Sequence, residues 1–158
     1  MSSPLSEQLL QCARRRIASA PNLTEADLRR ATSDLYYALF HRLCEALVEG
    51  LKQSDPVTPV ERVAWQRLYR LPSHAYVVKQ CKSDFVAKMP QGIRTFATQV
   101  AAFKTKRDDA DYDPIATFEL AAVRKDLDIA ESAVQRFDAC EPSSRRHFAI
   151  FAALKEQR

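Results

Sequence analysis

The sequence predicts an all-helical protein, and three observations support that fold class. The 158 residues fit a single domain that is large enough for a hydrophobic core. Glycine occurs only twice, whereas a sheet protein of this size needs many more turn residues. Apolar residues recur at helical spacing between breaks that contain proline, and extended β-branched runs are nearly absent. We therefore expect one helical domain over residues 1–158.

The first two helices are expected to form an N-terminal pair. Apolar residues at helical spacing predict a first helix over about residues 6–19, which Pro21 ends. Thr24 then offers an N-cap hydroxyl, and Asp27 stands three residues later as an acidic version of the capping box. From there a long helix is expected to reach about residue 52. Its core positions are predicted to include Tyr36, Phe40, Leu43 and Leu47.

Five further helices are expected in the rest of the chain. Thr58 followed by Pro59 is typical of an N-cap and first turn. Pro72 precedes HAYVVKQC, which we interpret as a short helix because its neighbours are helical, although three of its residues favour strands. Asp113 followed by Pro114 also predicts a helix start. The expected ranges are 60–71, 74–81, 93–109, 114–140 and 145–156.

Charge and cysteine content restrict the class of protein. The net charge of +4 is mildly basic and permits contact with nucleic acid. The four cysteines form no C-x-x-C motif, and no histidine stands at ligand spacing from them, so we expect no zinc site. Their spacing leaves disulfides open, but we interpret them as reduced core residues. The N-terminus lacks the pattern of a signal peptide, and no apolar run reaches the roughly 20 residues of a membrane span. We therefore expect a cytoplasmic protein without membrane contact.

The residues that could carry catalysis are few. The chain has three histidines, no glycine-rich phosphate loop, no H-E-x-x-H motif and no paired E-x-x-H motifs for a di-iron bundle. Redox, metal-dependent and acyl-transfer enzymes are therefore poor candidates. We expect neither a metal nor a cofactor.

Arginine and histidine remain as candidate catalytic residues. The stretch WQRLYRLPSHAYVVK places Arg67, Arg70 and His74 close together, with the Pro72 break before the histidine. Cleavage of RNA without a metal needs a group that moves protons and a fixed positive charge against the phosphorane. A histidine and an arginine supply both. The alternative is that His74 caps a helix and the arginines cover a solvated face.

Two other stretches could border such a site. LRRATSDLYYALFHRL contains Arg30 as a cation and places Tyr37 and His41 on one helix face. KTKRDDADYDP places Asp111 and Tyr112 where two helices meet. We take these five residues as candidates for substrate binding. The alternatives are a neutral histidine on an ordinary helix and a solvated loop in which an arginine pairs with neighbouring aspartates.

Two stretches resemble a known family. LRRATSDLYYALFHRL resembles the signature helix of HEPN domains (higher eukaryotes and prokaryotes nucleotide-binding), which carry a similar pattern of a small or polar residue, two others, then Tyr-Tyr-Ala-x-Phe-His. RDDADYDP resembles the stretch before the last long helix in many bacterial members. Together the two span roughly residues 28–137. The resemblance implies an up-and-down antiparallel helical bundle that is commonly a homodimer.

The resemblance also implies two classes of function. Many members are metal-independent endoribonucleases, several of them toxins beside an antitoxin, while others are binding modules. The active members use an arginine, four to six residues, then a histidine. Arg67 and His74 match this spacing, although Leu68 stands where a polar residue is usual, and Arg70 is one residue too close. The implied functions are RNA cleavage by His74 with Arg67 or Arg70, or binding of a nucleotide or partner. An antitoxin or nucleotidyltransferase would be the partner.

Overall fold

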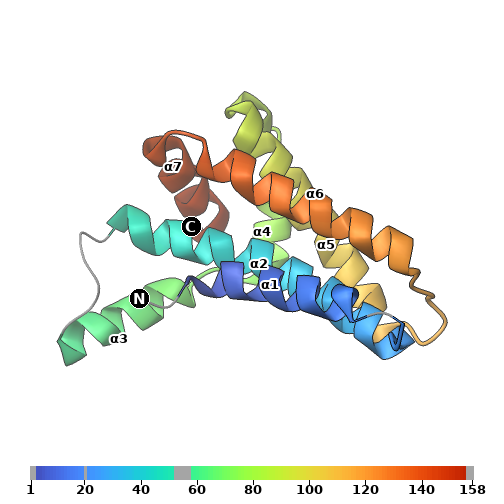
Figure 1. Cartoon of the computed structure of the whole chain (residues 1–158). Coiled ribbons are helices and arrows are strands. Elements are labelled where there is room, and N and C mark those ends of the chain that lie inside the picture. Colours follow the sequence, from blue (N-terminus) through green and yellow to red (C-terminus); the bar gives the residue numbers. More distant parts are fainter. Residues whose placement is uncertain (1–2, 20, 52–57, 156–158) are drawn as a thin grey trace.

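The structure is a computed structural model that describes residues 3–19, 21–51 and 58–155. These residues form seven α-helices and one short 3-10 helix, joined by loops (Figure 1). These residues contain no strand, which confirms the predicted all-helical class. The elements are α1 (Leu5–Ala18), α2 (Glu25–Leu51), α3 (Pro59–Tyr69), α4 (His74–Cys81), η1 (Val86–Lys88), α5 (Gln91–Tyr112), α6 (Leu120–Asp138) and α7 (Pro142–Ala153).

The long helix α2 lies at the centre of the bundle. It packs against α1, α3, α5, α6 and α7. Figure 1 shows α1 and α2 running antiparallel as one pair, while α5 and α6 form a second antiparallel pair that crosses the first. Helices α4 and α7 pack against each other and against α5 at one end of this second pair. Helix α3 lies along the outside of the bundle, on α2.

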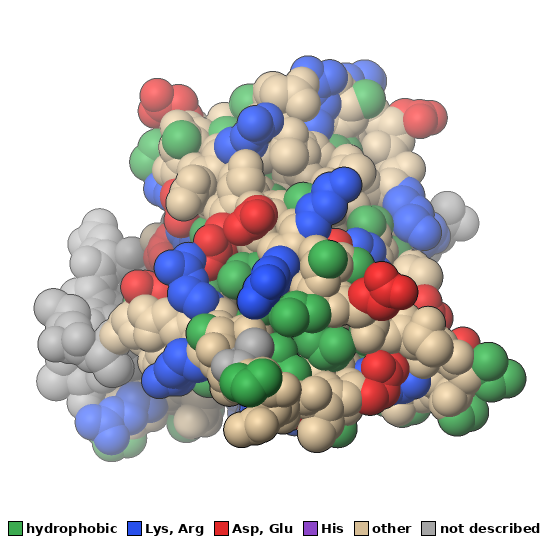
Figure 2. Space-filling model, turned by 45° about the vertical axis from the view of Figure 1, so that its right-hand side comes forward, with side chains coloured by type: hydrophobic (Ala, Val, Ile, Leu, Met, Phe, Trp, Pro, Cys, Tyr) green, Lys and Arg blue, Asp and Glu red, His purple; other side chains and the backbone are tan. Residues whose placement is uncertain are grey.

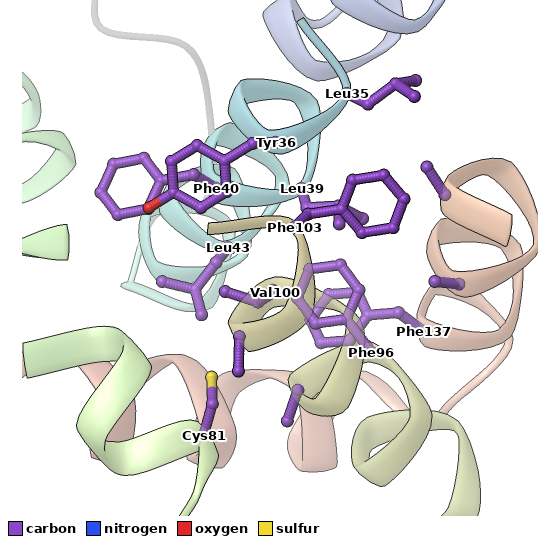
Figure 3. Close-up of a cluster of buried hydrophobic side chains, with 14 of the residues drawn as sticks. Leu35, Tyr36, Leu39, Phe40, Leu43, Cys81, Phe96, Val100, Phe103 and Phe137 are labelled. Carbon is purple, nitrogen blue, oxygen red and sulfur yellow. The ribbon is translucent and has the colours of Figure 1, made fainter. Parts of the chain in front are cut away.

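The core forms where the apolar face of α2 meets the aromatic side chains of α5, α6 and α7. Apolar residues spaced three and four apart keep one face of α2 buried along most of its length. Figure 3 shows Tyr36 and Phe40 side by side at one edge of this cluster, and Phe96 and Phe137 together at the other. The rings of Phe96 and Phe137 stack with 4.2 Å between their centroids. The core positions predicted on α2 are all buried, namely Tyr36, Phe40, Leu43 and Leu47.

Two predicted helix starts are confirmed by their capping bonds. The backbone N–H of Thr24 donates to Oδ2 of Asp27 at 3.0 Å, and the N–H of Asp27 donates to Oγ1 of Thr24 at 3.2 Å. At α3 the N–H of Thr58 donates to Glu61 at 2.8 Å, and the N–H of Glu61 donates back to Oγ1 of Thr58 at 3.2 Å. Each box satisfies backbone donors that the first turn leaves without partners. The expected limits of α1 and α4 also agree with the structure to within one residue.

The prediction that Asp113 and Pro114 start a helix is wrong. α5 continues beyond its expected end, and residues 113–119 form a loop before α6. Oδ1 of Asp113 accepts from the backbone N–H of Ile115 at 2.8 Å, which makes a local turn. Arg29 on α2 satisfies the carbonyls that the end of α5 leaves open, so the chain need not restart at once. Its guanidinium donates to the carbonyls of Asp109, Ala110, Asp113 and Ala116.

The prediction of reduced core cysteines is confirmed in part, since Cys12 and Cys140 are only half-buried. All four are free thiols. Cys44 and Cys81 are buried, and this burial raises the pKa of each thiol to about 12. Both are therefore inert core residues at neutral pH.

Candidate functional site

Aromatic rings and two histidines form a continuous band across four helices, which we term the aromatic–histidine band. Each member lies against the ring or guanidinium of the next. The members are Tyr36, Tyr37, Phe40 and His41 on α2, Trp65 and Tyr69 on α3, His74 on α4, and Arg107 and Tyr112 on α5.

His74 joins the band through both its ring face and its Nδ1 atom. The ring stacks on Phe40 with 4.0 Å between centroids, and Nδ1 lies 2.6 Å from the hydroxyl of Tyr36. Tyr36 is completely buried, and this burial raises its pKa, so the phenol stays protonated. Within the described residues the hydroxyl has no other hydrogen-bond partner, so it donates to Nδ1. The proton of the neutral His74 ring is therefore on Nε2.

His41 and Tyr69 repeat this arrangement between α2 and α3. Nδ1 of His41 lies 2.7 Å from the hydroxyl of Tyr69, and the two rings stack with 5.7 Å between their centroids. Burial raises the pKa of Tyr69, so this phenol stays protonated, and its hydroxyl shares one hydrogen bond with Nδ1 of His41. Trp65 also stacks on Tyr69, with 4.9 Å between the two ring centroids. The His41–Tyr69 pair thus holds α3 against α2.

Both histidines are neutral at pH 7, and the Nε2 atom of each is open. Burial lowers the pKa of His41, with a smaller contribution from His74. Burial also lowers the pKa of His74, followed by the charges of Arg107 and Lys104. Neither Nε2 atom has a hydrogen-bond partner among the described residues, and neither is an enclosed atom. The pair therefore supplies two open ring nitrogens at the edge of the core, of which Nε2 of His74 is a hydrogen-bond donor.

Arg107 connects the band to the end of α5. Its Nη2 donates to the hydroxyls of Tyr37 at 2.8 Å and Tyr112 at 3.3 Å, and its guanidinium carbon lies 5.4 Å and 5.1 Å from the two ring centroids. Nη1 lies 3.2 Å from Asp108, and Nε lies 2.7 Å from Asp111. The Nε–H does not point at the Asp111 oxygen, so that contact contributes charge and not a hydrogen bond. Two carboxylates thus balance this cation.

The structure brings most of the predicted site residues together. His74, Tyr37, His41 and Tyr112 are all members of the band. Asp111 lies at its edge, where it accepts a hydrogen bond from Ser33 and pairs with Arg107. As expected, residues of α2, α4 and the end of α5 therefore lie next to one another.

The predicted arginines lie elsewhere. Arg67 and Arg70 are exposed at the C-terminal end of α3, and Arg30 is exposed on α2. In the described part of the chain, neither Arg67 nor Arg70 makes a side-chain hydrogen bond or ion pair, with His74 or with any acid. The cation whose charge acts most strongly on His74 is Arg107.

Sequence reasoning missed Arg107 as a site residue. The prediction ended the helix at about residue 109 and placed Asp111 in a loop, which gave no reason to compare its side-chain direction with that of Arg107. As part of α5, Arg107 and Asp111 are four residues apart and so lie on one helix face. The sequence signal that could have found Arg107 is its spacing of four residues from Asp111, in a segment where most residues are charged. Tyr36 and Tyr69 were also missed as partners of the histidines, since their pairing depends on how the helices pack.

Two other features of the described surface bear on the search for a site. On the face drawn in Figure 2, basic, acidic and apolar side chains are interspersed, and no patch of one charge covers it. A depression of about 410 Å³ lies between α1 and α6, where Arg14 pairs with Glu131. No predicted site residue lines it. Its lining is Glu7, Leu10, Gln11, Arg14, Glu131, Val134 and Gln135.

The chain has no match among models of known protein families, among curated proteins or among solved structures. Within residues 3–19, 21–51 and 58–155, no group of three or more His, Cys, Asp or Glu side chains could hold a metal ion. No helix in these ranges is long and apolar enough to cross a membrane.

Proposed function

We propose that this protein is a HEPN-like helical module that binds RNA or a nucleotide without cleaving it. The observation that carries the proposal is the aromatic–histidine band with its two open imidazole nitrogens. Three arginines of the α3 segment, which also carries Trp65 and Tyr69, are exposed, and their side chains have no ion-pair partner in the described part of the chain. They are Arg62, Arg67 and Arg70.

The chemistry of the band suits a ligand with both bases and phosphates. Half-buried rings and neutral imidazoles offer stacking faces and hydrogen-bond donors to a base. Arginine side chains contact phosphate and set the position of the nucleic acid. Arg70 directly follows Tyr69 of the band, and Arg62 lies one helical turn before Trp65. Arg107 pairs with Asp108 and Asp111, so a phosphate would have to displace a carboxylate there. The α3 arginines pair with no carboxylate in the described part of the chain, so a phosphate can bind them directly.

The neutral tautomer of His74 favours binding over catalysis. A general base needs a free nitrogen lone pair facing the substrate. Here the lone pair is on Nδ1 and accepts from Tyr36, while Nε2 carries a proton. Catalysis by His74 would require the ring to exchange tautomers and leave a buried hydroxyl without an acceptor, which costs about 1–3 kcal/mol.

The family resemblance adds the remaining parts of the proposal. The Tyr-Tyr-Ala-x-Phe-His stretch lies on the central helix and supplies four members of the band, which supports a HEPN-like bundle. We propose with it a homodimer, a cytoplasmic location, and an antitoxin or nucleotidyltransferase as partner. Sedimentation equilibrium tests the dimer, and copurification with products of neighbouring genes tests the partner.

Fluorescence anisotropy with a labelled mixed-sequence RNA oligonucleotide, in chelator, tests the binding function. The triple variant Arg62→Gln, Arg67→Gln, Arg70→Gln should lose on the order of tenfold or more in affinity at low salt. Its log–log salt slope should flatten by up to about 2, because each lost phosphate contact accounts for roughly 0.7.

A variant with the same change in net charge is the matched control. Arg94, Arg124 and Lys125 are exposed on α5 and α6, away from the band, and their replacement by glutamine should change affinity much less. Equal losses in the two triple variants would show that binding follows overall charge alone, and the proposed site would be wrong.

Metal-independent ribonuclease activity is the second candidate. His41 and His74 are neutral and reach solvent, and catalysis by His74 would use the tautomer that leaves the Nε2 lone pair open to the RNA. Total RNA incubated with the protein in chelator should then give products with 2′,3′-cyclic phosphate ends. His74→Ala should lower turnover on the order of 10²–10⁴-fold. Intact RNA under these conditions leaves the binding module as the function.

A further inference from the structure

Tyr112 is the exposed end of the aromatic–histidine band. Its side chain lies at the last residue of α5, and 70% of its surface is exposed. Of the five tyrosines in the sequence, all of them in the described part of the chain, it alone is exposed. The band therefore ends in an aromatic ring with an open surface.

The ring is nevertheless held in place. Its hydroxyl accepts from Nη2 of Arg107 at 3.3 Å, and the Arg107 guanidinium lies 5.1 Å from the ring centroid. Arg107 is itself fixed by Asp108, Asp111 and Tyr37. An aromatic ring that is positioned by a cation loses little conformational freedom when a second ring stacks on it.

Phe85 shows how a different exposed aromatic is accommodated. It is 49% exposed, but its ring packs on Phe151 at 4.6 Å, so it extends an apolar surface of the bundle. Tyr112 has a polar neighbour instead, and it continues a series of ring contacts that leads to the histidines. This position suits a planar, polar ligand group such as a nucleobase.

We propose that Tyr112 is the platform on which an unpaired RNA base stacks, so that the protein binds single-stranded rather than double-stranded RNA. This inference rests on the proposed binding function. Bases inside a duplex stack on each other and offer no free face, whereas bases of a single strand can leave their neighbours for an aromatic side chain. The α3 arginines at the other end of the band take the phosphates of the same strand.

The experiment measures anisotropy with four RNA probes of equal length and label. They are a single strand, its blunt duplex, the same single strand with abasic sites, and a single strand of different sequence. We expect the two single strands to bind alike, since stacking tolerates any base. The duplex and the abasic strand should bind roughly 5- to 150-fold more weakly, the range that the loss of one stacked base produces.

The variants separate stacking from other contributions of Tyr112. Tyr112→Ala should weaken single-strand binding by the same factor and leave abasic binding unchanged, while Tyr112→Phe retains most of the affinity. Phe85→Ala is the control at an exposed aromatic outside the band. Equal affinity for abasic and intact strands, or no loss in Tyr112→Ala, overturns the stacking inference and leaves the proposed function. Absence of binding to every probe overturns both.

Discussion

Replacing Tyr36 by phenylalanine tests the hydrogen bond on which the assignment of His74 depends. Phenylalanine keeps the fully buried ring, whose centroid lies 6.1 Å from that of Phe40. It removes only the hydroxyl that donates to His74. The variant should therefore fold, and its differences from the wild type should report one hydrogen bond.

The magnitude follows from the burial of each partner. A net hydrogen bond contributes about 0.5–1.5 kcal/mol, and the half-buried His74 can recover part of this from water, so the cost stays in that range. For a chain of this length, that predicts a fall in melting temperature on the order of 1–6 °C. The pKa of His74 should rise in the variant, because the hydroxyl of Tyr36 stabilises the neutral ring.

Two measurements check this prediction. Thermal unfolding followed by circular dichroism gives the stability, and nitrogen chemical shifts of the imidazole give the tautomer and the pKa. In the wild type we expect Nε2–H at His74. Tyr69→Phe is the matched control, since it should change the same quantities at His41 and leave His74 nearly as it is. A wild-type ring with its proton on Nδ1, or a lower His74 pKa in the variant, would refute the reasoning.

Three other predictions concern stability. Leu47→Ala should lower the free energy of unfolding by about 2–5 kcal/mol, measured by urea denaturation, because Leu47 is completely buried. Arg29→Ala should speed amide exchange in residues 113–119, whose carbonyls it binds, whereas the exposed neighbour Arg30→Ala should not. Burial and two nearby cations lower the pKa of His74 from 6.5, so the unfolded chain binds more protons just below that pH. Stability should therefore fall as the pH drops through 6.5 in the wild type, and fall less in His74→Gln.

Local signals account for what the sequence predicted correctly. The capping boxes at Thr24 and Thr58 join residues only three apart, so the chain needs no tertiary structure to form them. The buried face of α2 also follows from spacing, since a helix with one apolar stripe has one way to turn toward a core. These features fixed the helices and the central position of Tyr36.

Long-range contacts account for what the sequence left out. The start predicted at Asp113 is wrong because Arg29, more than 80 positions earlier, binds the carbonyls around it. The expected contact of Arg67 with His74 depends on the path of the chain through Pro72, which spacing cannot provide. Arg107 instead supplies the charge that acts on His74, from a stretch in which the sequence pointed only to Asp111 and Tyr112.

The band contains residues that the fold requires and residues that it does not. His74 accepts a hydrogen bond from the fully buried Tyr36, and losing His74 would leave that phenol unsatisfied at a cost of about 1–3 kcal/mol; His41 is hydrogen-bonded to the half-buried Tyr69 and holds α3 against α2. Stability alone therefore explains their presence. It does not explain the open ring of Tyr112, or three α3 arginines without an acidic partner in the described part of the chain. The variants that separate function from structure are those at Tyr112 and at the α3 arginines, where replacement removes a surface for a ligand and no buried contact.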